Sequence, residues 1–128
     1  MIDEELKKTL EQHLSWLADP KSGKRADLRN TILTNADLRN TILIDANLQG
    51  ANLQNTNLRN ANLTGANLTD TSLIGADLID ADLIGADLID ADLRNANLRN
   101  ANLTNTNLTG ANLTDADLRN TILIDADH

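Results

Sequence analysis

The chain of 128 residues contains no cysteine, phenylalanine or tyrosine, and only one tryptophan. Without cysteine it can form neither a disulfide nor a thiolate metal site, which fits a reducing compartment. It also lacks the aromatic platforms on which many nucleic-acid modules stack bases. No apolar run approaches the roughly 20 residues that span a bilayer, and the N-terminus has no secretory signal. We therefore expect a cytoplasmic protein that does not contact a membrane.

Basic residues are scarce in most of the chain. Residues 1–25 carry five basic and five acidic side chains and are neutral overall. Residues 26–128 carry six arginines, no lysine and fourteen aspartates, which accounts for the net charge of -8. Because such a body repels phosphates and attracts cations or basic partners, we expect no direct binding of nucleic acid.

The chain is rich in a repeat of five residues. From Ala26 to Asp125 it divides without interruption into twenty pentapeptides, such as ADLRN and ANLTG. The third position is always leucine, the first is alanine or threonine, and the fifth is Asn, Asp or Gly. If leucine points inward, strand alternation turns the small first residue inward and the second and fourth residues outward. Since the fifth residue tolerates turn geometry, each unit is predicted to be a very short strand and a corner.

A corner every five residues makes the chain wind, and successive windings can pair as parallel strands. Equivalent side chains then stack about 4.8 Å apart along a narrow bore. The predicted structural core is the set of repeat leucines: Leu28, Leu33, Leu38, Leu43, Leu48, Leu53, Leu58, Leu63, Leu68, Leu73, Leu78, Leu83, Leu88, Leu93, Leu98, Leu103, Leu108, Leu113, Leu118 and Leu123.

The repeat A[DN]LXX resembles that of the pentapeptide repeat family over residues 26–127. The resemblance implies an all-β solenoid, namely a right-handed quadrilateral parallel β-helix with four pentapeptides per coil and about five coils. The residues alone leave square and triangular windings open, although one hint favours the square. The segment ADLRNTILIDA occurs at 36–46 and again at 116–126, and this shift of 80 residues is divisible by 20 but not by 15.

The N-terminal segment has a helical pattern instead. Asp3 can serve as its N-cap, and Pro20 closes it. Because a solenoid needs its first coil covered, residues 1–25 are predicted to be a capping helix and linker, and residues 26–128 the β-helix domain. A free helix that binds a partner is the alternative. The apolar stripe comprises Ile2, Leu6, Leu10, His13, Leu14, Trp16 and Leu17, of which Leu6, Leu10, Leu14, Trp16 and Leu17 are expected to form the cap.

Two outward features are candidate partner surfaces if a coil has twenty residues. An arginine column on the third face could meet a carboxylate-bearing partner, or Asp37 and Asp117 could neutralise their arginine neighbours as exposed pairs. An isoleucine girdle, one residue on each face, could be a contact zone, or it could shield the backbone ladder. The arginine column is Arg39, Arg59, Arg99 and Arg119, and the isoleucine girdle is Ile74, Ile79, Ile84 and Ile89.

The last complete pentapeptide suggests a third contact. Ile122 and Ile124 flank Leu123, and no second cap is encoded after them. The final coil should therefore expose unpaired backbone groups and the rim of the bore, which favours an end-to-end homodimer. A monomer whose end is covered by its own last residues is the alternative.

Signals for catalysis and metal binding are weak. Aspartates gather at Asp77, Asp80 and Asp82, but the calcium-loop pattern is absent. His13 is expected to belong to the cap, and His128 to a mobile terminus. No nucleophile motif or phosphate-binding glycine loop is present, and a filled bore offers no substrate pocket. We expect no enzyme activity, no catalytic residues, no metal and no cofactor.

The favoured function is that of a non-enzymatic structural or interaction protein, a rigid acidic rod that presents side-chain ladders to a protein partner. Many proteins that resemble it are small, stand-alone and without assigned activity, and are common in cyanobacteria. The resemblance also implies an alternative, because some family members mimic duplex DNA and modulate DNA gyrase and other type II topoisomerases. The acidic body agrees with that alternative, whereas the lack of phenylalanine and of a closing helix does not.

Overall fold

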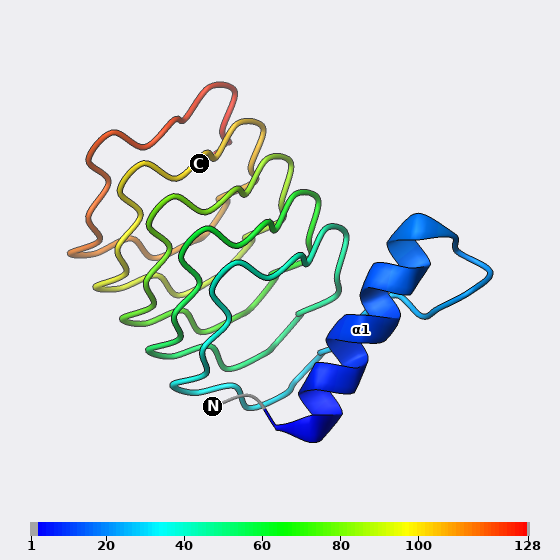
Figure 1. The fold of residues 1–128 in the computed structure, drawn as a ribbon. Coiled ribbons are helices and arrows are strands. Elements are labelled where there is room, and N and C mark those ends of the chain that lie inside the picture. The colour runs from blue at the N-terminus through cyan, green and yellow to red at the C-terminus, as the bar shows by residue number, and fades with distance from the viewer. Residues whose placement is uncertain (1–2, 128) are drawn as a thin grey trace.

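The computed structural model describes residues 3–127, in which a single helix lies across one end of a column of stacked coils (Figure 1). The helix, α1, spans Glu4–Ala18. The coils contain only isolated β-bridges, because each strand is too short to form a longer ladder. The predicted contribution of Ile2 to the apolar stripe and the prediction for His128 lie outside the described residues. No helix within this range is long and apolar enough to cross a membrane.

The ends of α1 follow from local chemistry. The Asp3 carboxylate accepts a hydrogen bond from the Leu6 backbone N–H at 2.7 Å, which satisfies one of the free donors of the first turn. Glu4 and Glu5 add negative charge where the helix dipole is positive. The helix ends at Ala18, because the following residue, Asp19, has an extended backbone and precedes Pro20.

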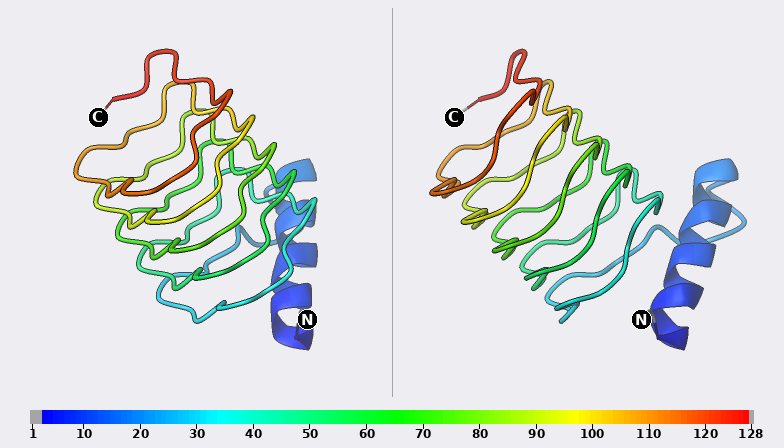
Figure 2. Two further views of the ribbon diagram at one scale, coloured as in Figure 1. Left: turned by 90° about the vertical axis from the view of Figure 1, so that its left-hand side faces the viewer. Right: turned by 60° about the vertical axis from the view of Figure 1, so that its left-hand side comes forward.

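The coils repeat every twenty residues. Every described bridge is parallel and joins residues 20 positions apart, as between Asp27 and Asn47. Four pentapeptides therefore make one turn, and successive turns stack in register (Figure 2). Backbone hydrogen bonds join the turns: Leu28 N–H donates to the Asn47 carbonyl at 2.7 Å, and Asn47 N–H donates to the Ala26 carbonyl at 3.0 Å.

The corners explain the restricted fifth position of the repeat. Positive φ angles occur at all twenty fifth positions, at fifteen Asn or Asp residues and at five glycines. At the first corner Asn30 has a φ of 57°, and Thr31 N–H donates to the Leu28 carbonyl across the turn at 3.3 Å. Most side chains are strained in this left-handed region, whereas Asn, Asp and Gly tolerate it.

The bore is filled by the third and first residues of the repeat. Leucines of the middle coils, such as Leu78 and Leu83, have no exposed surface, and the alanines beside them are equally buried. Threonine can replace alanine because its hydroxyl finds a backbone acceptor inside the bore. Thr56 Oγ1 donates to the Leu53 carbonyl at 2.8 Å, which offsets the cost of burying the hydroxyl.

The predicted core is wrong at Leu123, which is 46% exposed. Leu113 and Leu118 in the same coil are only half-buried. A repeat leucine is covered by the leucines of the coils on both sides, and within residues 3–127 no coil packs on the far side of this one. The pentapeptide pattern alone therefore overestimates the burial of the final coil.

Helix α1 packs on the opposite end of the column. Leu6 and His13 are buried against the first coil, and Leu10 and Trp16 are half-buried. The predicted cap is wrong at Leu14, which is 48% exposed. With 3.6 residues per turn, positions 6, 10, 13 and 17 share one side of the helix, whereas position 14 is turned about 100° from position 13.

Candidate interaction surfaces

The second position is aspartate or asparagine in most of the repeats, and these side chains contact the backbone. Asp77 Oδ1 accepts from the Ile79 N–H at 3.1 Å, and Asn67 Oδ1 accepts from the Thr69 N–H at 3.0 Å. The same contact to the residue two positions ahead recurs along the coils, which accounts for the frequency of Asp and Asn at this position. It fixes the outward direction of these side chains, so that each column has a regular geometry.

Where aspartate and arginine occupy the second and fourth positions, they pair within one strand. Arg39 donates from Nε to Asp37 Oδ1 at 2.9 Å and from Nη2 to Asp37 Oδ2 at 2.7 Å. This contact with Arg39 lowers the pKa of Asp37 to about 2 and raises the pKa of the arginine. The same bidentate geometry joins Arg29 to Asp27, Arg94 to Asp92 and Arg119 to Asp117.

Where asparagine occupies the second position, the arginine reaches the next coil. Arg59 follows Asn57, and its Nε donates to Asp77 Oδ2 at 2.6 Å. Arg99 Nε lies 3.9 Å from Asp117 Oδ2. The arginine column is thus a set of ion pairs within and between coils. Asparagine in place of aspartate at position 57 is the sequence signal for this contact between coils, which the spacing within one pentapeptide does not predict.

Arginine pairing leaves the surface of the coils with unpaired charge of one sign, which is negative. All six arginines of residues 26–127 form ion pairs, and they use five aspartates. The other aspartates of the coils pair with no lysine or arginine within residues 3–127. We call these nine residues the uncompensated aspartates: Asp45, Asp70, Asp80, Asp82, Asp87, Asp90, Asp115, Asp125 and Asp127.

The isoleucine girdle presents less apolar surface than its pattern predicts. All four of its isoleucines are half-buried. The register places Gln54 and Arg94 on either side of Ile74, and Thr64 and Thr104 on either side of Ile84, in the neighbouring coils. These neighbours cover much of each isoleucine, which favours shielding of the ladder over a contact zone.

The exposed apolar side chains lie at the two ends of the column. At the α1 end, Ile32 is 81% exposed and Ile42 is 42% exposed. At the other end, Ile122 is 42% exposed and Ile124 is 63% exposed, beside the half-exposed Leu123. Ile122, Leu123 and Ile124 thus form an exposed apolar rim at this end of the column.

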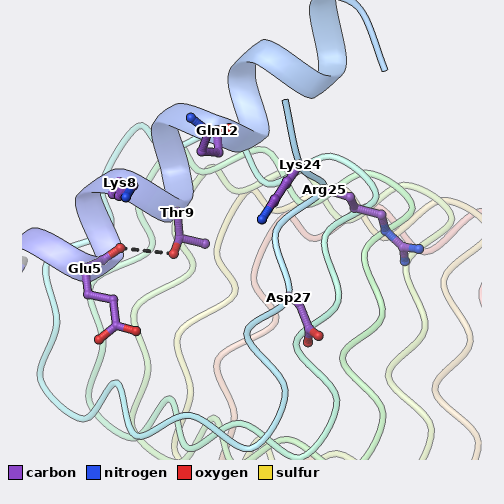
Figure 3. Close-up of a pocket in the computed structure, with 7 residues that line it drawn as sticks. All are labelled: Glu5, Lys8, Thr9, Gln12, Lys24, Arg25 and Asp27. Carbon is purple, nitrogen blue, oxygen red and sulfur yellow. Dashed lines mark hydrogen bonds between the residues drawn. The ribbon is translucent and has the colours of Figure 1, made fainter. Parts of the chain in front are cut away.

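A groove of about 560 Å³ runs between α1 and the segment that enters the first coil (Figure 3). Its walls alternate in charge, with Lys8, Lys24 and Arg25 among Glu5 and Asp27. All five of these residues are exposed, so the groove does not enclose a ligand. Elsewhere in residues 3–127, no three His, Cys, Asp or Glu side chains are arranged to hold a metal ion.

The coil geometry defines this chain as a β-helical solenoid protein. A family profile described as pentapeptide repeats (8 copies) matches residues 24–60, 61–100 and 86–123. The chain belongs to the pentapeptide repeat family, which confirms the resemblance seen in the sequence and makes the solenoid a right-handed β-helix. A search of curated proteins gives no match.

Several solved structures of pentapeptide repeat proteins are similar to this chain. HetL, from the cyanobacterium Nostoc sp. strain PCC 7120 and involved in heterocyst differentiation regulation, is 39% identical with a TM-score of 0.63. That match covers 78% of this chain and 49% of HetL, so the chain spans about half of that protein. A protein of the Arabidopsis thaliana thylakoid lumen is 36% identical with a TM-score of 0.63, and the match covers 71% and 67% of the two chains.

The fluoroquinolone resistance protein QnrB1 also resembles the chain, but distantly. It is 18% identical with a TM-score of 0.43, and the match covers 80% of this chain and 64% of QnrB1. At this level the likeness supports no argument about shared function.

Proposed function

We propose that this chain is a non-enzymatic interaction protein, a rigid acidic rod of five coils that presents its outward side chains to a protein partner. Residues 1–25 form its helical cap and linker, and residues 26–128 form its solenoid domain. The filled bore and the continuous ladder between coils support a rigid scaffold rather than a substrate site. Its contacts are then made by the outer surface and the two ends.

The uncompensated aspartates are the observation that supports this function best. Because every arginine of the coils is already paired, the charge left to attract a partner is negative. Asp87 and Asp90 belong to one pentapeptide, and Asp70 occupies the same corner as Asp90 one coil earlier. A basic protein surface fits this arrangement, and its association should weaken as salt screens the charges.

The proposal is tested by affinity capture from a lysate of the source organism with three baits. The wild type is compared with Asp70→Asn/Asp87→Asn/Asp90→Asn, which removes charge and, at position 87, keeps the side-chain oxygen that accepts the hydrogen bond from the Ile89 N–H. The matched control converts the isoleucine girdle to threonine, a residue that already occupies equivalent positions. Circular dichroism verifies that each bait is folded.

Loss of a salt-sensitive partner from the aspartate variant alone supports the proposal. Loss of a partner from the girdle variant alone would instead indicate that the partner contacts the isoleucine girdle: Ile74, Ile79, Ile84 and Ile89. The proposed charge-based function is wrong if the same proteins, or none, remain on all three baits.

A second copy of the chain is a further proposed partner, seated on the rim formed by Ile122, Leu123 and Ile124. The exposure of these three side chains supports the contact. Sedimentation equilibrium should give a dimer for the 128-residue chain and a monomer for Ile122→Thr/Ile124→Thr. A wild type that stays monomeric at high protein concentration contradicts the proposal.

The alternative function, modulation of DNA gyrase as a DNA mimic, draws on the same uncompensated aspartates, since they supply negative charge as phosphates do. It is tested by gyrase supercoiling in the presence of the chain. Inhibition that is lost in the triple aspartate variant favours this alternative, and no inhibition at high protein concentration removes it.

A further inference from the structure

His13 is the most buried side chain of α1, with no exposed surface. Its Nε2 lies 2.8 Å from the Ile44 carbonyl oxygen, and its Nδ1 lies 2.9 Å from the backbone nitrogen of Ala26. Ala26 opens the first coil and Ile44 lies near its end. One imidazole therefore ties the helix to both ends of the first turn of the solenoid.

These two contacts require one protonation state. A carbonyl can only accept, so Nε2 must carry a hydrogen; a backbone N–H can only donate, so Nδ1 must offer its lone pair. The ring is thus neutral, with its hydrogen on Nε2. A second proton on Nδ1 would point at the Ala26 N–H, so that a hydrogen bond is lost and two donors face each other in a site closed to water.

The net effect of the surroundings also favours the neutral ring of His13. Burial lowers the pKa of His13 below its usual value of 6.5, and the contact with the Ile44 carbonyl opposes this only in part. From the linker, the Arg25 charge lowers the pKa; from the first coil, the Asp45 charge raises it, and both effects are smaller than that of burial. On α1 itself the neighbour is the uncharged Trp16 ring, stacked with its centroid 5.6 Å away.

We propose that His13 is an acid-sensitive latch between α1 and the first coil. Neutral His13 holds the helix on the coil, and protonation releases the helix. Release uncovers the rim of the first coil around Leu28 and Leu33, beside the already exposed Ile32. Acid thus converts a covered apolar end into an open one without unfolding the solenoid, whose coils are joined by their own backbone ladder.

The pH range in which α1 is released follows from the linkage between helix docking and proton binding by His13. The docked helix binds the proton less well than the released helix, so docking is strongest above the free histidine pKa of 6.5. As the pH falls below that value, the docking equilibrium constant falls by up to about tenfold per pH unit. It levels off once the pH is below the pKa of His13 in the docked state.

The only tryptophan provides the test, because Trp16 stacks on the latch itself. Trp16 emission and backbone amide exchange at Ala26 are followed from about pH 8 to about pH 4.5, with circular dichroism as the measure of intact coils. The wild type is compared with His13→Gln, whose amide can donate and accept but does not titrate in this range. His128→Gln is the control for the other histidine.

The wild type and His128→Gln should show a reversible shift to longer emission wavelength and faster exchange at Ala26, with a midpoint below pH 6.5 and unchanged coils. His13→Gln should show no such transition. The latch is refuted if the transition persists in that variant. It is also refuted, from the wild type alone, if the imidazole titrates by NMR while Ala26 exchange stays constant, a result that does not require the variant to fold.

Discussion

The position of a leucine along the bore should determine how much its truncation to alanine lowers the free energy of unfolding. Leu78 has no exposed surface and is covered by leucines of the coils on both sides, whereas Leu123 is 46% exposed at the open end. Truncation of a fully buried leucine to alanine costs about 3–5 kcal/mol, because it adds a cavity to the lost transfer free energy. At Leu123 water fills the space and half of the side chain was already hydrated, so the cost should be about 1 kcal/mol.

Urea unfolding followed by circular dichroism measures both values. Leu78→Ala should lower the free energy of unfolding by at least about 2 kcal/mol more than Leu123→Ala, with similar denaturant slopes. Leu78→Met is the matched control, since it keeps the volume and should cost less than about 1.5 kcal/mol. Equal losses for the two alanine variants would refute the view that each coil is stabilised by the coils on both sides of it.

Three further outcomes follow from the corners, the bore and the ion pairs. At Gly85 no atom lies within 4 Å of an added Cβ, so only the backbone φ of 66° limits a substitution. Gly85→Asn should leave the free energy of unfolding in urea nearly unchanged, whereas Gly85→Ala should lower it by about 1 kcal/mol, because alanine is strained in the left-handed region. Thr56→Ala should cost about 1 kcal/mol or less by the same measurement, since it removes one hydrogen bond but installs the common residue of the repeat. The Arg39 contact lowers the pKa of Asp37 from 3.8 to about 2. The ionised Asp37 therefore stabilises the fold above pH 3.8, and this stabilisation is lost as the pH falls toward 2. Asp37→Asn should flatten this part of a curve of unfolding free energy against pH.

Strand alternation and turn chemistry made the coils readable from the sequence. Leucine at the third position of each pentapeptide and Asn, Asp or Gly at the fifth already dictate an inward side chain and a left-handed corner, as at Leu28 and Asn30. The number of pentapeptides per turn could not be derived in this way. It depends on the angle between successive strands, and the bridge between Asp27 and Asn47 is what defines it.

The surface was harder to predict than the bore. The pairing of Arg39 with Asp37 is visible as a spacing of two, but the contact of Arg59 with Asp77 depends on side-chain reach between coils. The helical stripe placed His13 in the cap without indicating its two backbone partners, because these come from residues 13 and 31 positions away. Interactions of this kind are fixed only when the helix is docked.

The constant step of twenty residues bears on how such a chain can change in length. In-frame duplication of one whole coil inserts a new layer and leaves every earlier and later side chain on its own face. Duplication of a single pentapeptide preserves the bore equally well, but it rotates everything beyond it by a quarter turn, so that a column of aspartates continues on a different face. The fold therefore accepts the insertion of one pentapeptide, but the surface columns remain continuous only when a whole coil of twenty residues is inserted. An insertion in the gene can thus create a new surface without any substitution in the core.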